Sequence, residues 1–144
     1  MVNHLGTIKL KRDRKDIVDW QELIKLINRT SLLPKTAKDL LCICIKKRLD
    51  DETRVYLSKE EVENIYGSSL DNNSYKQILK DSTDILVKLA FVFKKDGAFN
   101  VIQLINNFDY SNNEYILEFG KRFSRLYLND FIDYDEVSIE LSTI

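Results

Sequence analysis

Few residues in this sequence have the types and spacing that catalysis requires. His4 is the only histidine among 144 residues, so a serine–histidine–aspartate triad, a cysteine–histidine pair or a histidine zinc motif cannot be built within one chain. No glycine-rich phosphate loop is present. The acidic clusters over 50–52 and 60–63 are typical of solvated surfaces. Carboxylate-only metal sites stay open, but the sequence otherwise predicts no enzyme, no catalytic residue, no metal and no cofactor.

The two cysteines and the apolar runs indicate where the protein resides. Cys42 and Cys44 lie two residues apart in an expected helix, about 200° apart around its axis, so they cannot share a metal or easily form a disulfide. Reduced core cysteines are typical of the cytosol. The first twenty residues hold no apolar signal segment, and no apolar run approaches the roughly 20 residues of a membrane span. The sequence therefore predicts a cytoplasmic protein without membrane contact.

Basic side chains are the main chemical signal. Residues 1–48 contain 12 basic and 5 acidic residues, whereas residues 49–144 contain 10 and 18. Such a split indicates an end that faces a polyanion, although charges that solvate separate faces would give the same count. Seven bases on expected surface elements are candidates to neutralise DNA phosphates, and each alone is equally an ordinary surface charge. They are Lys76, Lys80, Lys94, Lys95, Lys121, Arg122 and Arg125.

The first third of the chain is expected to be mainly helical. The basic segment over 1–15 is expected to form a short strand or an extended arm. Apolar residues at helical spacing predict an amphipathic helix over 17–29, in which Trp20 is a packing residue. A second helix is expected over 36–48, with Thr36 as its N-terminal cap.

The next elements are a short strand and two helices. Residues 54–57 are β-type, and Ser58 with Glu61 has the pattern of a capping box that opens a third helix. Gly67 is expected to end that helix in a left-handed conformation. Asn72 or Asn73 is the expected cap of a fourth helix, whose apolar residues keep helical spacing from Tyr75 to Leu89.

After residue 90 the apolar period changes from 3.6 to 2. The Asp96-Gly97 pair between two such runs is a strong signal for a β-hairpin with a basic tip. A return strand over 99–108, a turn over 110–113 and a third strand over 115–119 are expected to follow. The order helix, strand, helix, helix, hairpin is that of a winged helix-turn-helix, in which the short strand would join the hairpin. We therefore expect an α+β fold, a helical bundle with a long hairpin wing, preceded by an extra N-terminal helix.

In such a fold the fourth helix would face the DNA major groove. Its N-terminal residues lie nearest the bases, and they are Asn72, Asn73, Ser74, Tyr75 and Lys76. Tyr75 would either contact a base or anchor its helix in the core. Lys94 and Lys95 at the hairpin tip would contact phosphate. Residues 1–30 are expected to form a basic arm with its helix, and residues 31–144 the winged-helix domain.

Three stretches resemble a known family. The sequences LPKTAKDLL (33–41) and YKQILK (75–80), followed by the long hairpin, resemble the first winged-helix domain of Rep-type plasmid replication initiators, which bind repeated origin sequences. KRFSRLYL (121–128) resembles the short helix after that hairpin. LSTI (141–144) resembles the start of the next helix, which would continue into a second winged-helix domain. The resemblance covers residues 33–144 and implies backbone contacts to duplex DNA and dimer formation, with the main base reading in the second domain.

The return strand gives a competing signal because it is apolar on both faces. Four residues are expected on the face away from the helices, and they are Ile102, Leu104, Phe108 and Ile116. Such a face is usually covered, either by the Trp20 helix or by a second subunit. The second alternative predicts a homodimer. The sequence thus predicts a DNA-binding and dimerisation domain of a replication initiator, with host replication proteins as further partners. A protein interaction module without DNA contact and a winged-helix transcriptional regulator are the alternatives.

Overall fold

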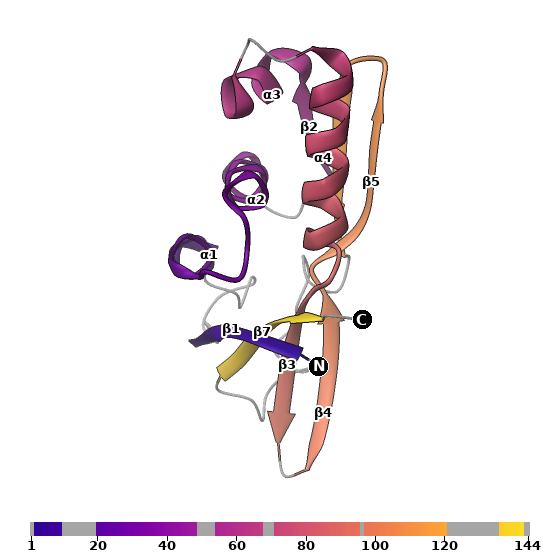
Figure 1. The fold of residues 1–144 in the computed structure, drawn as a ribbon. Helices are drawn as coiled ribbons and strands as arrows, with labels where there is room; N and C mark the ends of the chain where they lie inside the picture. Colours follow the sequence, from indigo (N-terminus) through magenta and orange to yellow (C-terminus); the bar gives the residue numbers. More distant parts are fainter. Residues whose placement is uncertain are drawn as a thin grey trace.

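The chain combines helices with two antiparallel sheets, which confirms the expected α+β class. The computed structural model describes residues 2–9, 20–48, 54–67, 71–95, 97–120 and 136–142. The helices in these residues are α1 (Trp20–Arg29), α2 (Lys35–Lys47), α3 (Lys59–Tyr66) and α4 (Asn72–Leu86). The strands are β1 (Val2–Lys9), β2 (Arg54–Ser58), β3 (Leu89–Lys95), β4 (Ala98–Gln103), β5 (Ile105–Ser111), β6 (Glu114–Phe119) and β7 (Glu136–Ser142). Figure 1 shows α2, α3 and α4 beside β2 and β5, with β1, β7, β3 and β4 at the other end of the molecule.

The predicted limits of α3 are confirmed. The Ser58 hydroxyl accepts from the Glu61 backbone N–H at 3.2 Å, and the Glu61 carboxylate accepts from the Ser58 N–H at 3.2 Å, so the capping box is complete. Gly67 follows the helix at φ +101, in the region that favours glycine.

Two predicted helix caps are wrong by one or two residues. Thr36 does not cap α2, because Pro34 takes an extended conformation and its carbonyl accepts from the Lys38 N–H at 3.0 Å. The helix therefore begins one residue earlier. Neither Asn72 nor Asn73 caps α4, because the Asp71 carboxylate accepts from the Ser74 N–H at 2.8 Å.

A four-stranded sheet joins the two ends of the chain, in the order β1-β7-β3-β4. β1 runs antiparallel to β7, with Lys9 opposite Glu136. Strands from the beginning and the end of the sequence are therefore neighbours, and their pairing places one base opposite one acid. The prediction that residues 141–144 begin a helix is wrong for Leu141 and Ser142. They lie in β7, where Val137, Ile139 and Leu141 alternate into the core.

A second sheet has three strands, in the order β2-β6-β5. The expected hairpins both form: Gly97 has φ +84 between β3 and β4, and Asn112 and Asn113 have φ +52 and +64 between β5 and β6. However, β2 pairs with β6, so the expectation that it would join the Asp96-Gly97 hairpin is wrong. The latter hairpin belongs to the four-stranded sheet, so the sheet content is larger than a simple wing.

The expected return strand is divided where the chain passes from one sheet to the other. Leu104 lies between β4 and β5, donates from its N–H to the Leu89 carbonyl at 3.2 Å and accepts from the Gly120 N–H at 2.9 Å. A Cβ on Gly120 would lie 2.7 Å from the Gln103 carbonyl oxygen, so only glycine permits this approach. The register shifts again between Ile105 and Asn107.

This division removes the single apolar face expected on the return strand. Ile102 and Leu104 are buried in the core of the chain. Phe108 is opposite Leu117 in the register and packs against the same core, with its ring 6.1 Å from that of Tyr115. Ile116 alternates with the buried Tyr115 and Leu117 and is half-buried on the other face. The expectation that the four residues share one uncovered face is therefore wrong, because a strand that changes sheets does not keep one alternation.

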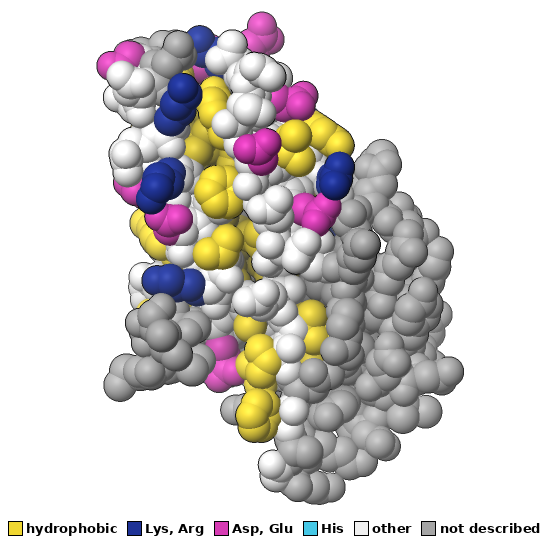
Figure 2. Space-filling model, turned by 90° about the vertical axis from the view of Figure 1, so that its right-hand side faces the viewer, with side chains coloured by type: hydrophobic (Ala, Val, Ile, Leu, Met, Phe, Trp, Pro, Cys, Tyr) yellow, Lys and Arg dark blue, Asp and Glu magenta, His cyan; other side chains and the backbone are white. Residues whose placement is uncertain are grey.

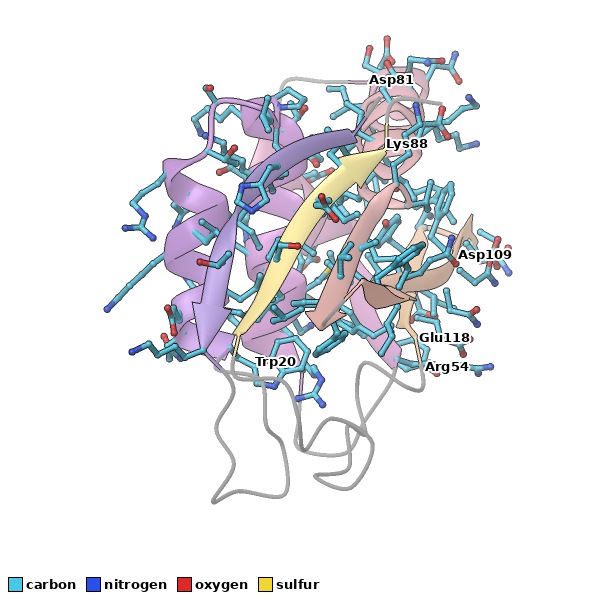
Figure 3. All side chains as sticks on the ribbon, turned by 90° about the horizontal axis from the view of Figure 1, so that it is seen from below. Trp20, Arg54, Asp81, Lys88, Asp109 and Glu118 are labelled. Carbon is cyan, nitrogen blue, oxygen red and sulfur yellow. The ribbon has the colours of Figure 1, made fainter. Side chains whose placement is uncertain are left out.

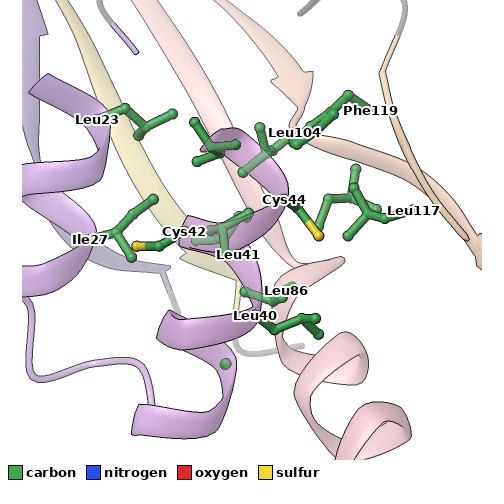
Figure 4. Close-up of a cluster of buried hydrophobic side chains, with 14 of the residues drawn as sticks. Leu23, Ile27, Leu40, Leu41, Cys42, Cys44, Leu86, Leu104, Leu117 and Phe119 are labelled. Carbon is green, nitrogen blue, oxygen red and sulfur yellow. The ribbon is translucent and has the colours of Figure 1, made fainter. Parts of the chain in front are cut away.

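One core connects the helices to both sheets. Figure 4 shows Leu23 and Ile27 of α1 and Leu117 and Phe119 of β6 on either side of α2. Both cysteines are free and buried, as expected, and burial raises the pKa of the Cys44 thiol to about 12.

The described residues contain neither a membrane-spanning helix nor a cluster of metal ligands. None of these helices combines the length and the apolar character that crossing a bilayer requires. The same residues include no group of three or more histidine, cysteine, aspartate or glutamate side chains that could hold a metal ion.

Candidate nucleic-acid interface

The pair of helices α3 and α4 positions the predicted DNA-contacting residues. Gly67 ends α3 and Asp71 opens α4, so only a short connection separates the two helices. Tyr75 is buried, and its hydroxyl donates to the Gly67 carbonyl oxygen. Of the two roles left open for Tyr75, the structure places it as the core anchor of α4. Ser74 is half-buried, and its N–H is held by the Asp71 cap, whose pKa this hydrogen bond lowers.

The solvent face of α4 carries amides and charges of both signs. Asn73, Lys76 and Lys80 are exposed, as a DNA-contacting helix requires. Lys80 forms an ion pair with Asp84 at 3.0 Å, which raises the pKa of Lys80, and Gln77 donates to Asp81 at 2.7 Å. Figure 2 shows blue and magenta side chains interspersed on the half of the molecule that carries α4. This face is therefore polar but not strongly basic.

The hairpin that joins β2 is acidic. β5 and β6 contain no lysine or arginine, and Asp109 and Glu114 are exposed. Glu118 accepts from Arg54 at 2.8 Å and from the Asn106 amide at 2.7 Å, and Figure 3 shows Arg54 next to Glu118. A hairpin with this charge has little attraction for phosphate.

The remaining predicted contacts are not brought to this hairpin. Lys94 and Lys95 end β3 in the four-stranded sheet, and their side chains lie outside the described residues. The helix expected over 121–128, with Lys121, Arg122 and Arg125, also lies outside the described residues. The structure thus gathers Asn73, Lys76 and Lys80 on one helix and does not bring a described basic hairpin to them.

Two surface features were not singled out from the sequence. Phe99 and Val101 of β4 are 69% and 49% exposed, at the edge of the four-stranded sheet. Figure 2 shows hydrophobic side chains extending down the face that carries α4, β5 and β4. A second feature is a group of basic residues on α1 and α2. Its signal was available, because lysines and arginines recur there at helical spacing with few acids.

Comparison of the chain with protein-family models, with curated proteins and with solved structures finds no match in any of the three.

Proposed function

We propose that this chain is a DNA-binding and dimerisation domain of the kind found in Rep-type plasmid replication initiators, and that α4 contacts the origin duplex. The observation that carries the proposal is the order α2, β2, α3, α4, followed after β3 and β4 by the hairpin β5–β6, together with the sheet order β2-β6-β5. A helix, a strand, two helices and a hairpin that pairs with the first strand are the parts of a winged helix-turn-helix. The four-stranded sheet would be an addition to that unit.

The chemistry of α4 supports contact with both bases and phosphates. Asn73 and Gln77 are exposed amides, which can donate and accept hydrogen bonds at base edges. Lys76 and Lys80 are exposed cations that would neutralise phosphates flanking the groove. Because these contacts are few, we expect modest affinity and weak sequence preference from this domain. Host replication proteins remain candidate partners of the assembled initiator.

A salt-dependent titration tests the proposal. Fluorescence anisotropy with a mixed-sequence duplex of about 30 base pairs would give log affinity against log salt, with a slope of about −0.9 per neutralised phosphate. Replacing Lys76 and Lys80 by alanine should remove up to two phosphate contacts and make the slope less negative by about 1.8. Lys88→Ala is the matched control, because Lys88 is equally exposed but lies beyond the C-terminal end of α4. Failure of the unaltered protein to bind at low salt would refute the proposal.

A protein interaction module is the second candidate, and the exposed edge of β4 favours it. β4 has no charged residue from Ala98 to Gln103, whereas the opposite edge strand, β1, carries the exposed His4 and Lys9 and a register shift. Unprotected apolar edges are sites of strand pairing. An antiparallel pair of β4 strands would join two copies into one continuous sheet without bringing like charges together.

Light scattering at tens of micromolar tests this homodimer. We expect a dimer for the unaltered protein and a monomer when Phe99 and Val101 are both replaced by serine. Tyr56→Ser is the control, because Tyr56 is also exposed but lies on β2. A monomer at every concentration, or a dimer that the double substitution leaves intact, would exclude dimerisation through β4.

A further inference from the structure

The strongest concentration of positive charge in the described residues lies on α1 and α2. Residues 20–48 contain seven basic and two acidic residues. Five of the basic side chains reach the outer surface of this helix pair, which we call the α1–α2 surface. They are Lys25, Arg29, Lys35 and Lys46, which are exposed, and Lys38, which is half-buried.

Helix geometry places these residues on the solvent side of their helices. At about 100° per residue, Lys25 and Arg29 lie about 40° apart around α1. By the same spacing, Lys35, Lys38 and Lys46 fall within about 80° of one another around α2. The opposite sides of both helices are buried, with Ile27 and Leu41 among the buried residues. The four exposed cations therefore point to solvent because the apolar stripes fix the rotation of each helix.

Contacts between the helices bring the two sets of cations together. The Lys38 ammonium donates to the Asn28 carbonyl oxygen at 3.4 Å, and the Cys42 thiol donates to the Asn28 side-chain oxygen at 3.4 Å. Lys38 thus lies over the C-terminal end of α1, because Asn28, which it contacts, directly precedes Arg29 in that helix. Figure 3 shows long side chains with nitrogen ends projecting away from the flank formed by α1 and α2.

Few acids offset this charge. Asp39 forms an ion pair with Lys35 at 2.7 Å, and Glu22 is half-buried. α4 differs, because Lys76 and Lys80 are balanced there by Asp81 and Asp84. Figure 1 shows α1 and α2 on one flank of the molecule and α4 with β5 on the other. The two surfaces can therefore be altered independently.

We propose that the α1–α2 surface binds the phosphate backbone of duplex DNA and supplies most of the salt-dependent affinity of this domain. The inference rests on the proposed DNA-binding function and assigns the backbone contacts to a face other than α4. Eleven residues separate Lys35 from Lys46, which is about 16 Å along the helix axis. Duplex DNA presents about one charge per 1.7 Å of its axis, so a surface of this length meets several phosphates.

An anionic bilayer is the other polyanion that a basic surface attracts, and the structure favours it less. A helix that lies on a membrane buries an apolar face beside its basic one. In residues 20–48 the only large hydrophobic side chain that is exposed is Leu32, at 37%. The apolar stripes of α1 and α2 are already buried in the core, so only electrostatic attraction would hold this surface on a bilayer.

Two matched triple variants test the inference. The first replaces Lys25, Arg29 and Lys46 by glutamine, and the second replaces Lys76, Lys80 and Lys88. All six residues are exposed, and glutamine has nearly the helix propensity of lysine and arginine, so both variants should fold. Circular dichroism melts would verify this. Each variant removes three positive charges, so a difference between them reports position and not net charge.

We expect the first variant to reduce the salt slope for the mixed-sequence duplex by about 2.7 and to weaken binding roughly tenfold or more near 0.1 M salt. The second should have a smaller effect. Equal slopes for the first variant and the unaltered protein, with binding lost in the second, would overturn this inference and leave the proposed function standing. No binding of the unaltered protein would refute both. Binding to vesicles of phosphatidylserine and phosphatidylcholine without binding to DNA would also overturn the inference.

Discussion

The α1–α2 surface and the surface of α4 with the β5–β6 hairpin are built alike but differ in charge. Each uses amphipathic helices whose apolar residues enter the common core. The first carries four exposed cations and the half-buried Lys38, with one exposed ion pair, whereas α4 balances two lysines with two aspartates and all charged residues of the hairpin are acidic. The difference teaches that the position of a helix in a helix-turn-helix order does not decide which face attracts phosphate. The charges that each helix exposes decide it, and three of the five cations belong to α2, inside that order.

The two surfaces are mechanically connected. Trp20 of α1 meets Phe119 of β6 edge to face, with ring centroids 6.0 Å apart, and the Arg48 guanidinium lies 4.1 Å from the centroid of the Trp20 ring. The role of Trp20 as a packing residue is therefore confirmed. Loss of this contact should affect both surfaces together, whereas charge substitutions should separate them.

The largest expected effect comes from Phe119→Ala. Phe119 is fully buried, so truncation should lower the free energy of unfolding by about 3–5 kcal/mol, through lost burial and the cavity left behind. Urea denaturation followed by circular dichroism measures it. Phe99→Ala is the matched control, since Phe99 is 69% exposed and should change the stability little at low protein concentration. Equal effects of the two substitutions would contradict the connection described above.

A smaller effect is expected from Ser58→Ala. This substitution removes the N-terminal cap of α3, which packs beside α4, and does not touch the α1–α2 surface. The loss should be about 1 kcal/mol, and Ser31→Ala in an exposed bend should change nothing. Because Lys47 and the Ser58 N–H lower the pKa of Glu61 below its ordinary 4.5, the contribution of that carboxylate is complete above this pH and lost as the pH falls through the lowered value. The difference between the Glu61→Gln and unaltered proteins should therefore shrink in acid, because glutamine keeps the shape of the side chain without its charge. A constant difference from pH 7 down to pH 2 would show that Glu61 does not take part.

The smallest effect on stability is expected from Asp39→Asn and Asp84→Asn. These substitutions also distinguish most directly between DNA binding by the α1–α2 surface and by α4. Each breaks an exposed i,i+4 ion pair, with Lys35 or Lys80, and should change the free energy of unfolding by only about 0.5 kcal/mol or less. Each also frees one lysine. The substitution on the surface that meets DNA should make the salt slope more negative by about 0.9. We expect this for Asp39→Asn, and a larger change for Asp84→Asn would reverse the assignment.

Local patterns predicted the elements well. The capping box at Ser58, the turn glycine at 97 and the asparagine turn at 112–113 lie where expected, because each depends on residues adjacent in the chain. The strand over 137–141 also had a local signal, the alternation of Val137, Ile139 and Leu141. A resemblance that favoured a helix there led to the wrong prediction.

The candidate site was less predictable. Asn73, Lys76 and Lys80 are exposed on α4 as expected, but Tyr75 is buried, and the basic tip of the β3–β4 hairpin is in a different sheet from β2. No local pattern identifies the partner of β2. Its pairing with β6 places Arg54 opposite Glu118 and buries Val55 with Leu57, and both depend on residues some 60 positions away.

The sequence by itself determined the helices, the two hairpins, the buried cysteines and the α+β class, since spacing, caps and turn residues act over a few neighbours. Only the tertiary structure decided that the chain changes sheets at Leu104, that β1 at its beginning pairs with β7 near its end, and that a basic surface forms on α1 and α2. These features depend on which distant segments can bury their apolar faces against each other. That choice also fixes where the charges of each helix point.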